Sequence, residues 1–137
     1  MNIPLILVFT PIFAYIIAGS LKFLINSFNL KKLAFSDIGM GGFPSTHNTI
    51  TSSCSSVVFM HFGAQSVEFM ICLTFSLIVA IDSMDLRQKI AKHAKEINIL
   101  KNNSELRESI GHKPNEVLGG IIIGIVSGLV LYLLFGN

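Results

Sequence analysis

Long apolar stretches with almost no charged side chains constrain this chain most strongly. The stretch from Ile3 to Leu24 contains one charged residue, Lys22. Val67 to Met84 carries charge only near its ends, and Val117 to Phe135 carries none. As helices rising about 1.5 Å per residue, such stretches approach or exceed the roughly 30 Å of hydrocarbon in a bilayer. The sequence therefore predicts an integral membrane protein.

A fourth stretch, Asn48 to Phe62, is uncharged but rich in serine and threonine. Small and hydroxylated residues let helices approach one another closely in a membrane. We therefore expect this segment to lie inside the bundle rather than to face lipid. Together the stretches predict an all-α, integral membrane helical bundle with about four transmembrane helices. A chain of 137 residues favours one domain, residues 1–137.

Charge is scarce and lies at one end of the expected bundle. Only 13% of the residues are charged and the net charge is +2, too little for a nucleic-acid-binding surface. Four helices place the polar segments Asn26 to His47 and Asp85 to Glu116 at the same end, with all ten lysines and arginines. By the positive-inside rule we expect this end to face the cytoplasm, from a cell inner or plasma membrane.

Two histidines stand at this polar end, each near a proline and an apolar helix. The first lies in Gly-Gly-Phe-Pro-Ser-Thr-His, residues 41–47, and the second in Gly-His-Lys-Pro-Asn-Glu, residues 111–116. The N–H groups at a helix start attract anions. Glu116 follows His112 by four residues, so its carboxylate can fix the imidazole tautomer and leave the other ring nitrogen nucleophilic. Two imidazoles near cations at an anion-binding end match the needs of phosphoryl transfer.

These motifs, with the segment Asp82 to Arg87 between them, resemble the divergent branch of the type 2 phosphatidic acid phosphatases. That branch is related to acid phosphatases and vanadium-dependent haloperoxidases, and the resemblance covers about Lys22 to Gly124. It implies a phosphatase-like domain that hydrolyses a phosphomonoester or diphosphate of a lipid. The lipid would be of the phosphatidylglycerophosphate, phosphatidate or polyprenyl type. The reaction would pass through a phosphohistidine and require neither cofactor nor metal.

The resemblance also implies a role for each matching residue. His112 would attack phosphorus and Glu116 would orient it. His47 would protonate the leaving oxygen. Ser45 and Thr46 would contact the phosphate group.

The sequence departs from the family pattern at the cations. Leu106 and Asn29 stand where arginines are usual, and Thr46 replaces a glycine. We therefore choose the phosphate-binding cations by position, taking first Lys22 and Arg87 at the membrane ends of helices. The second choices are Lys31, Lys32 and Arg107.

Three alternatives stay open. Asp82 either supports catalysis directly or pairs with Lys22 or Arg87. The chain could instead be a non-catalytic membrane protein that binds anionic lipid headgroups, or a small transporter subunit. A metal site built from His47, His93, His112 and Asp82 is less favoured, because no short ligand spacing supports it. The expected partners are the membrane, a lipid phosphate and a second copy of the chain, without nucleic acid.

Overall fold

The structure is a computed structural model that describes residues 4–30, 42–108 and 110–136. Within these ranges every regular element is a helix, which confirms the all-α prediction. The helices are α1 (Leu5–Val8), α2 (Thr10–Leu30), α3 (Thr46–Phe62), α4 (Val67–Met84), α5 (Leu86–Lys101) and α6 (Pro114–Phe135).

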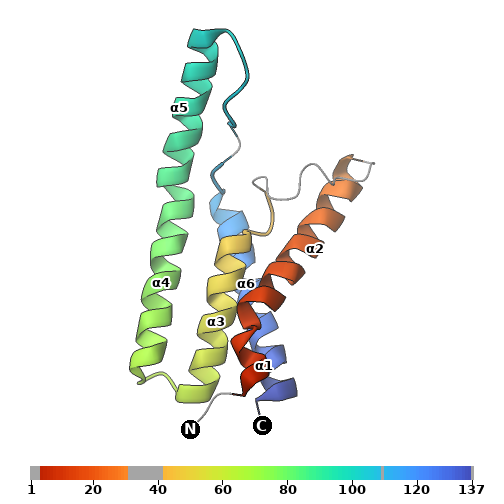
Figure 1. Ribbon diagram of the computed structural model, residues 1–137, viewed down its shortest axis with the longest axis vertical. Coiled ribbons are helices and arrows are strands. Elements are labelled where there is room, and N and C mark those ends of the chain that lie inside the picture. Colours follow the sequence, from red (N-terminus) through yellow and green to blue (C-terminus); the bar gives the residue numbers. More distant parts are fainter. Residues whose placement is uncertain (1–3, 31–41, 109, 137) are drawn as a thin grey trace.

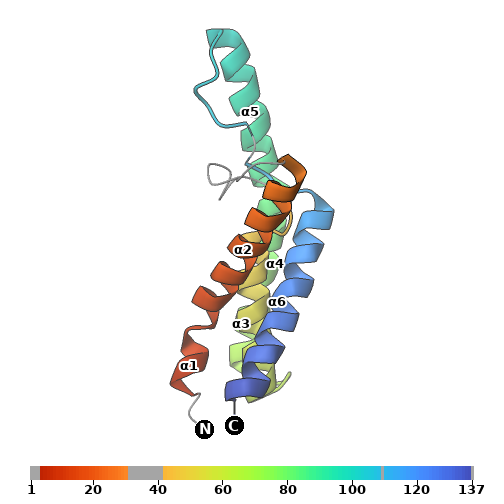
Figure 2. The same ribbon diagram turned by 90° about the vertical axis from the view of Figure 1, so that its right-hand side faces the viewer.

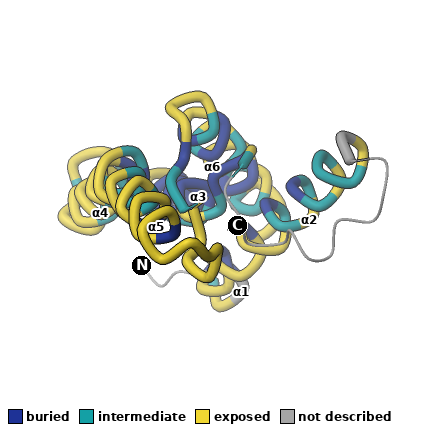
Figure 3. Tube along the Cα trace, turned by 90° about the horizontal axis from the view of Figure 1, so that it is seen from above, coloured by how far each residue is buried: buried dark blue, intermediate teal, exposed yellow. Residues whose placement is uncertain are grey.

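Helices α2, α3, α4 and α6 form a bundle with α3 at its centre (Figure 1). Helix α3 contacts α2, α4 and α6, whereas α4 and α6 barely touch one another. Both chain ends lie at the same end of the bundle, and α5 extends past the opposite end (Figures 1 and 2). Seen from above, burial is concentrated in α3 and α6, while α4 is largely exposed (Figure 3).

Three described segments are long and apolar enough to cross a membrane: Thr10–Phe28, Val67–Lys101 and Pro114–Phe135. With α3 running between them, the bundle agrees with the predicted count of about four. The first apolar stretch is divided into two helices rather than one. Helix α1 ends at Val8, and the Thr10 hydroxyl donates to the Leu7 carbonyl at 2.6 Å. Pro11 stands in the first turn of α2. A backbone N–H there would have no acceptor within the helix, so the missing N–H of proline costs no hydrogen bond.

Helix α5 follows α4 after the single residue Asp85. The Asp85 N–H donates to the Ile81 carbonyl at 2.9 Å, and the Asp85 carbonyl accepts from the Lys89 N–H at 3.0 Å. Asp85 is therefore hydrogen-bonded to both helices, although it belongs to neither. The two helices form one long rod, of which α5 is the part beyond the bundle (Figure 2).

The closest helix pair is α3 and α6, and small residues make the contact. A Cβ atom at Gly120, Gly124 or Gly128 would lie 2.5 Å from a backbone oxygen of the segment that leads into α3 or of α3 itself. The facing hydroxyls are largely satisfied within their own helices, as where Thr49 donates to the Ser45 carbonyl at 2.9 Å. The expected burial of the serine- and threonine-rich stretch is confirmed by its buried serine, threonine and asparagine residues, which are Asn48, Thr49, Thr51, Ser52, Ser53, Ser55 and Ser56.

Replacing Gly124 with alanine should destabilise the bundle. The added methyl group would meet the Thr49 carbonyl at 2.5 Å and the Ser52 Cβ at 2.8 Å, so the two helices must move apart. Overpacking of this kind costs about 1–3 kcal/mol. Thermal unfolding in detergent should show a lower Tm for Gly124→Ala. Gly19→Ala is the matched control, because a Cβ at Gly19 has no neighbour within 4 Å. Equal Tm values for the two variants would contradict this account.

Candidate active site

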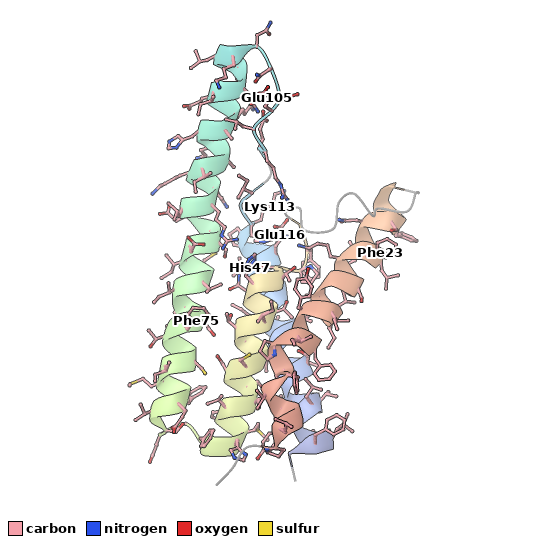
Figure 4. All side chains as sticks on the ribbon, viewed as in Figure 1. Phe23, His47, Phe75, Glu105, Lys113 and Glu116 are labelled. Atoms are coloured by element: carbon pink, nitrogen blue, oxygen red, sulfur yellow. The ribbon has the colours of Figure 1, made fainter. Side chains whose placement is uncertain are left out.

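His47 and His112 lie at the same end of the bundle, where α3 and α6 begin. Figure 4 shows His47 beside Glu116 and Lys113 at this end. His47 is the second residue of α3, and His112 stands two residues before Pro114, the first residue of α6. His112 is only 5% exposed, whereas His47 is open to solvent. Pro44 lies just before α3, which begins at Thr46 with Ser45 as its N-cap.

Glu116 holds His112 in one orientation. The Nδ1 atom of His112 lies 3.0 Å from Oε2 of Glu116, and the same oxygen accepts from the Lys113 N–H at 3.1 Å. An imidazole that donates from Nδ1 to a carboxylate carries its lone pair on Nε2. The four-residue spacing therefore produces the geometry expected from the sequence.

The backbone of His112 is fixed by the α4–α5 rod. Its N–H donates to the Ser83 carbonyl at 3.1 Å, and its carbonyl accepts from Nε2 of Gln88 at 2.7 Å. Gly111 makes this approach possible, since a Cβ there would lie 2.5 Å from Cγ of Gln88. Sequence reasoning missed Ser83 and Gln88, because nothing in their spacing indicates a contact with residue 112.

Burial lowers the pKa of both imidazoles, and the charges of the site cations lower it further. For His112, burial is the largest cause of the lowered pKa; the hydrogen bond from Glu116 opposes it, and the charges of Lys22 and Arg87 add to it. For His47, which lies outside the three candidate spans, partial burial lowers the pKa most, followed by Arg87, His112 and Lys22. Both imidazoles are therefore within electrostatic range of the same two cations.

Arg87 bridges His47 and Asp82. Its Nε donates to Oδ2 of Asp82 at 2.7 Å, and its Nη1 lies 3.5 Å from Nε2 of His47. The Arg87 and Asp82 side chains are 29% and 30% exposed, so the pair is open to water at the mouth of the site. Of the partners considered for Asp82, the one in contact is Arg87.

Ser45 and Asn48 join the starts of α3 and α6. The Ser45 N–H donates to the Glu116 carbonyl at 3.0 Å. Asn48 Nδ2 donates to Oγ of Ser45 at 2.9 Å and to Oγ of Ser83 at 3.2 Å. Both side chains are buried, and Oδ1 of Asn48 has no hydrogen-bond partner within the described residues. Asn48 is a further residue that the motifs did not single out. Thr46, the first residue of α3, is partly exposed.

The remaining predicted cations differ in their placement. Lys22 of α2 is 3% exposed, and its charge acts on both histidines and on Glu116. Arg107 is exposed in the segment between α5 and α6, near enough to act electrostatically on Lys22. Lys31 and Lys32 lie outside the described residues.

The proposed four-residue metal site is not assembled. Within the described parts of the chain, no group of three or more His, Cys, Asp or Glu side chains is arranged to hold a metal ion. His93 lies on the exposed surface of α5.

An apolar groove of about 410 Å³ begins one helical turn below the site, between α4 and α6. Ala80 at its upper end precedes Ser83 by three residues, and Ser52 follows Asn48 by four. Serines of α3 form the floor, and apolar side chains of α4 and α6 form the walls. The lining residues are Ser52, Ser55, Ser56, Phe59, Phe69, Leu73, Ser76, Leu77, Ala80, Ile121, Ile125 and Leu129.

Comparisons with known proteins show what this chain is similar to. A sequence model of the family described as "Divergent PAP2 family" matches residues 4–127. The chain is also similar to the uncharacterized membrane protein YuiD of Bacillus subtilis (strain 168). The two are 28% identical over 145 aligned positions, which cover 90% of this chain and 89% of the relative. No solved structure matches the chain. The similarity and the three apolar helices together identify a membrane protein.

Replacing Glu116 with glutamine should lower the pKa of His112 further. The carboxylate raises that pKa through its hydrogen bond and its charge, and the neutral amide retains only part of the first effect. Histidine NMR signals followed across a pH titration would measure the change. Glu68→Gln is the control, because Glu68 lies at the far end of the bundle in the first turn of α4. A His112 pKa in Glu116→Gln that equals or exceeds the wild-type value would refute the pairing.

Proposed function

Because the chain belongs to the Divergent PAP2 family, we propose that it is a lipid phosphate phosphatase that works through a phosphohistidine. The observation that carries the proposal is the buried His112–Glu116 pair, with Nδ1 and Oε2 3.0 Å apart, at the same bundle end as His47 and Arg87. One imidazole is held with Nε2 unprotonated, and the other is exposed beside a guanidinium. This division suits a nucleophile and a proton donor.

The reaction would proceed in two displacements. Nε2 of His112 attacks phosphorus, the bond from phosphorus to the leaving oxygen breaks, and His47 gives that oxygen a proton. Water then attacks the phosphohistidine and passes a proton to His47. The P–N bond breaks, its electron pair returns to Nε2, and inorganic phosphate leaves. Both histidines finish in their starting protonation states.

Cations at the site would carry the charge of the phosphoryl group. Arg87 is directed by Asp82, so that its other nitrogens are available near His47. Lys22 acts on both histidines from α2. Together they neutralise the non-bridging oxygens, which is the main electrostatic requirement of phosphoryl transfer. Asp82 is then a positioning residue, while Arg107 and the Thr46 hydroxyl are secondary candidates for phosphate contact.

The lowered pKa values fit these roles. A lowered pKa keeps His112 neutral, and therefore nucleophilic, at neutral pH. His47 must hold a proton, and a bound phosphate dianion favours this by offsetting the positive charges of Arg87 and Lys22. Activity should therefore fall at acid pH as His112 gains a proton, and at alkaline pH as His47 loses one.

The groove below the site favours a lipid as substrate. From Ala80 to Phe69 it spans eleven residue steps of α4, about 16 Å at 1.5 Å per step. This is close to one leaflet of a hydrocarbon core of roughly 30 Å. A single hydrocarbon chain can lie in it while its phosphate stays at the polar end. Because the lysines and arginines gather at that end, we place the site on the cytoplasmic side.

A binder of anionic lipid headgroups is the second candidate. Full burial of Ser45, whose Oγ accepts from Asn48, favours it, since this hydroxyl is not open to a ligand in the present arrangement. Binding of lipid phosphates without phosphate release across a broad substrate panel would decide for this alternative.

Replacing His112 with alanine should abolish phosphate release. Loss of the nucleophile removes the covalent route, and such changes lower kcat by about a thousandfold or more. Phosphate release from a panel of phosphatidate, phosphatidylglycerophosphate and polyprenyl diphosphate would measure this, with vanadate as an expected inhibitor. His93→Ala on exposed α5 is the control and should keep wild-type activity. Wild-type phosphate release by His112→Ala would remove His112 as nucleophile.

Filling the groove should impair long-chain substrates selectively. Leu73→Trp adds bulk to the groove wall, so kcat/KM for a long-chain lipid phosphate should fall roughly tenfold, equivalent to about 1.4 kcal/mol. A short-chain phosphate in the same detergent should be hydrolysed at the wild-type rate. Ile78→Trp, an exposed position of α4 outside the groove lining, is the matched control. An equal loss on both substrates would argue against the groove as a chain-binding site.

A further inference from the structure

Helix α5 projects beyond the bundle at the polar end (Figures 1 and 2). It carries five cations in sixteen residues, and burying so many charges in hydrocarbon would be too costly. The helix therefore stands outside the apolar core of the membrane. The chain that follows it folds back along one face, where Asn98 Nδ2 donates to the Leu106 carbonyl at 2.7 Å and Asn98 Oδ1 accepts from the Leu106 N–H at 3.0 Å. Ala94 and Asn98 are buried on this face.

A second face of α5 is apolar and uncovered. Its side chains follow one another at steps of four, three, four and three residues, the spacing of a coiled-coil seam. Among them Leu86, Ile90, Ile97 and Leu100 are 54%, 44%, 38% and 85% exposed. Large apolar side chains gathered in water on one helix face mark an interaction surface. We call this face the α5 seam, and its residues are Leu86, Ile90, His93, Ile97 and Leu100.

The residue types along the α5 seam specify a kind of partner. Ile90 and Ile97 occupy one of the two alternating core positions, and Leu86, His93 and Leu100 occupy the other. β-branched residues at the first core position and leucines at the second favour a parallel, two-stranded coiled coil. A polar residue at one core position, here His93, fixes register at some cost in stability.

Charges beside the α5 seam complement those of an identical helix. In a parallel pair, the residue just before the first core position of one helix lies opposite the residue just after the second core position of the other helix. The two residues are five positions apart in the sequence. Glu96 of one helix therefore meets Lys101 of the other, and two-fold symmetry forms this pair twice. Lys89 is already paired with Asp85 of its own chain at 2.9 Å, so it adds no uncompensated charge.

We propose that the α5 seam binds the α5 seam of a second copy of this chain, in a parallel two-stranded coiled coil outside the bilayer. Two copies inserted in the same direction are related by a two-fold axis along the membrane normal. Their α5 helices are then parallel and can lie side by side. Two heptads form a short interface on their own. Confinement of both copies to one membrane raises their effective concentration and supports the contact. This proposal does not depend on the phosphatase assignment.

The dimerisation constant of the full chain in lipid vesicles tests the proposal, measured by single-molecule photobleaching over a range of protein densities. Ile90→Asn combined with Ile97→Asn should raise the dissociation constant at least tenfold. His93→Leu should lower it several-fold, whereas Lys95→Leu, on the opposite face of α5, should leave it unchanged. Wild-type Tm values in detergent would show that each variant keeps its bundle.

A charge reversal tests the register. Glu96→Lys alone and Lys101→Glu alone should each raise the dissociation constant about threefold, and the double variant should restore the wild-type value. A wild-type chain that stays monomeric at every density would overturn the proposal. Equal effects of His93→Leu and Lys95→Leu would indicate unspecific adhesion and overturn it as well. Failure of the double reversal to restore binding would exclude the parallel pairing.

Discussion

The contact between α3 and α6 is the constraint on which the candidate site depends. Glycines of α6 let the two backbones meet, since a Cβ at Gly120 would lie 2.5 Å from the Ser45 carbonyl. The same approach lets the Ser45 N–H reach the Glu116 carbonyl at 3.0 Å. Because each histidine stands near the start of its helix, this packing brings His47 and His112 to one place. Helix packing in the membrane and the geometry of the proposed chemistry are thus parts of the same arrangement.

The site itself combines a rigid half with an exposed half. His112 is buried and held through its ring by Glu116 and through its backbone by Ser83 and Gln88. His47 and Arg87 are open to solvent and contact one another at 3.5 Å. Such a division suits a reaction in which the nucleophile must be oriented while the proton donor exchanges with water. Desolvation is the largest cause of the lowered pKa of His112 and also helps to keep it neutral.

The sequence predicted the structural features that depend on residues close to one another in the chain. The apolar stretches predicted α2, α4 and α6, and the four-residue interval between His112 and Glu116 predicted their contact. The break between α1 and α2 differs from expectation, because it depends on capping and turn geometry. Other contacts were beyond prediction because they join distant segments. The Ser83 carbonyl, which accepts from the backbone of His112, and Asn48, which bridges two serines, carry no sequence signature of those roles. The contact between Arg87 and Asp82 likewise depended on tertiary packing.

The position of Arg87 within α5 has a mechanical consequence. Arg87 is the second residue of α5, so its backbone turns with the projecting part of the rod, whereas His47 belongs to the central helix. Leu100 stands thirteen positions after Arg87, a lever arm of about 20 Å at 1.5 Å per residue. A tilt imposed on the tip turns α5 as one helix and so moves the backbone of Arg87. A contact made at the outer end of α5 therefore affects the distance between the Arg87 guanidinium and the His47 imidazole.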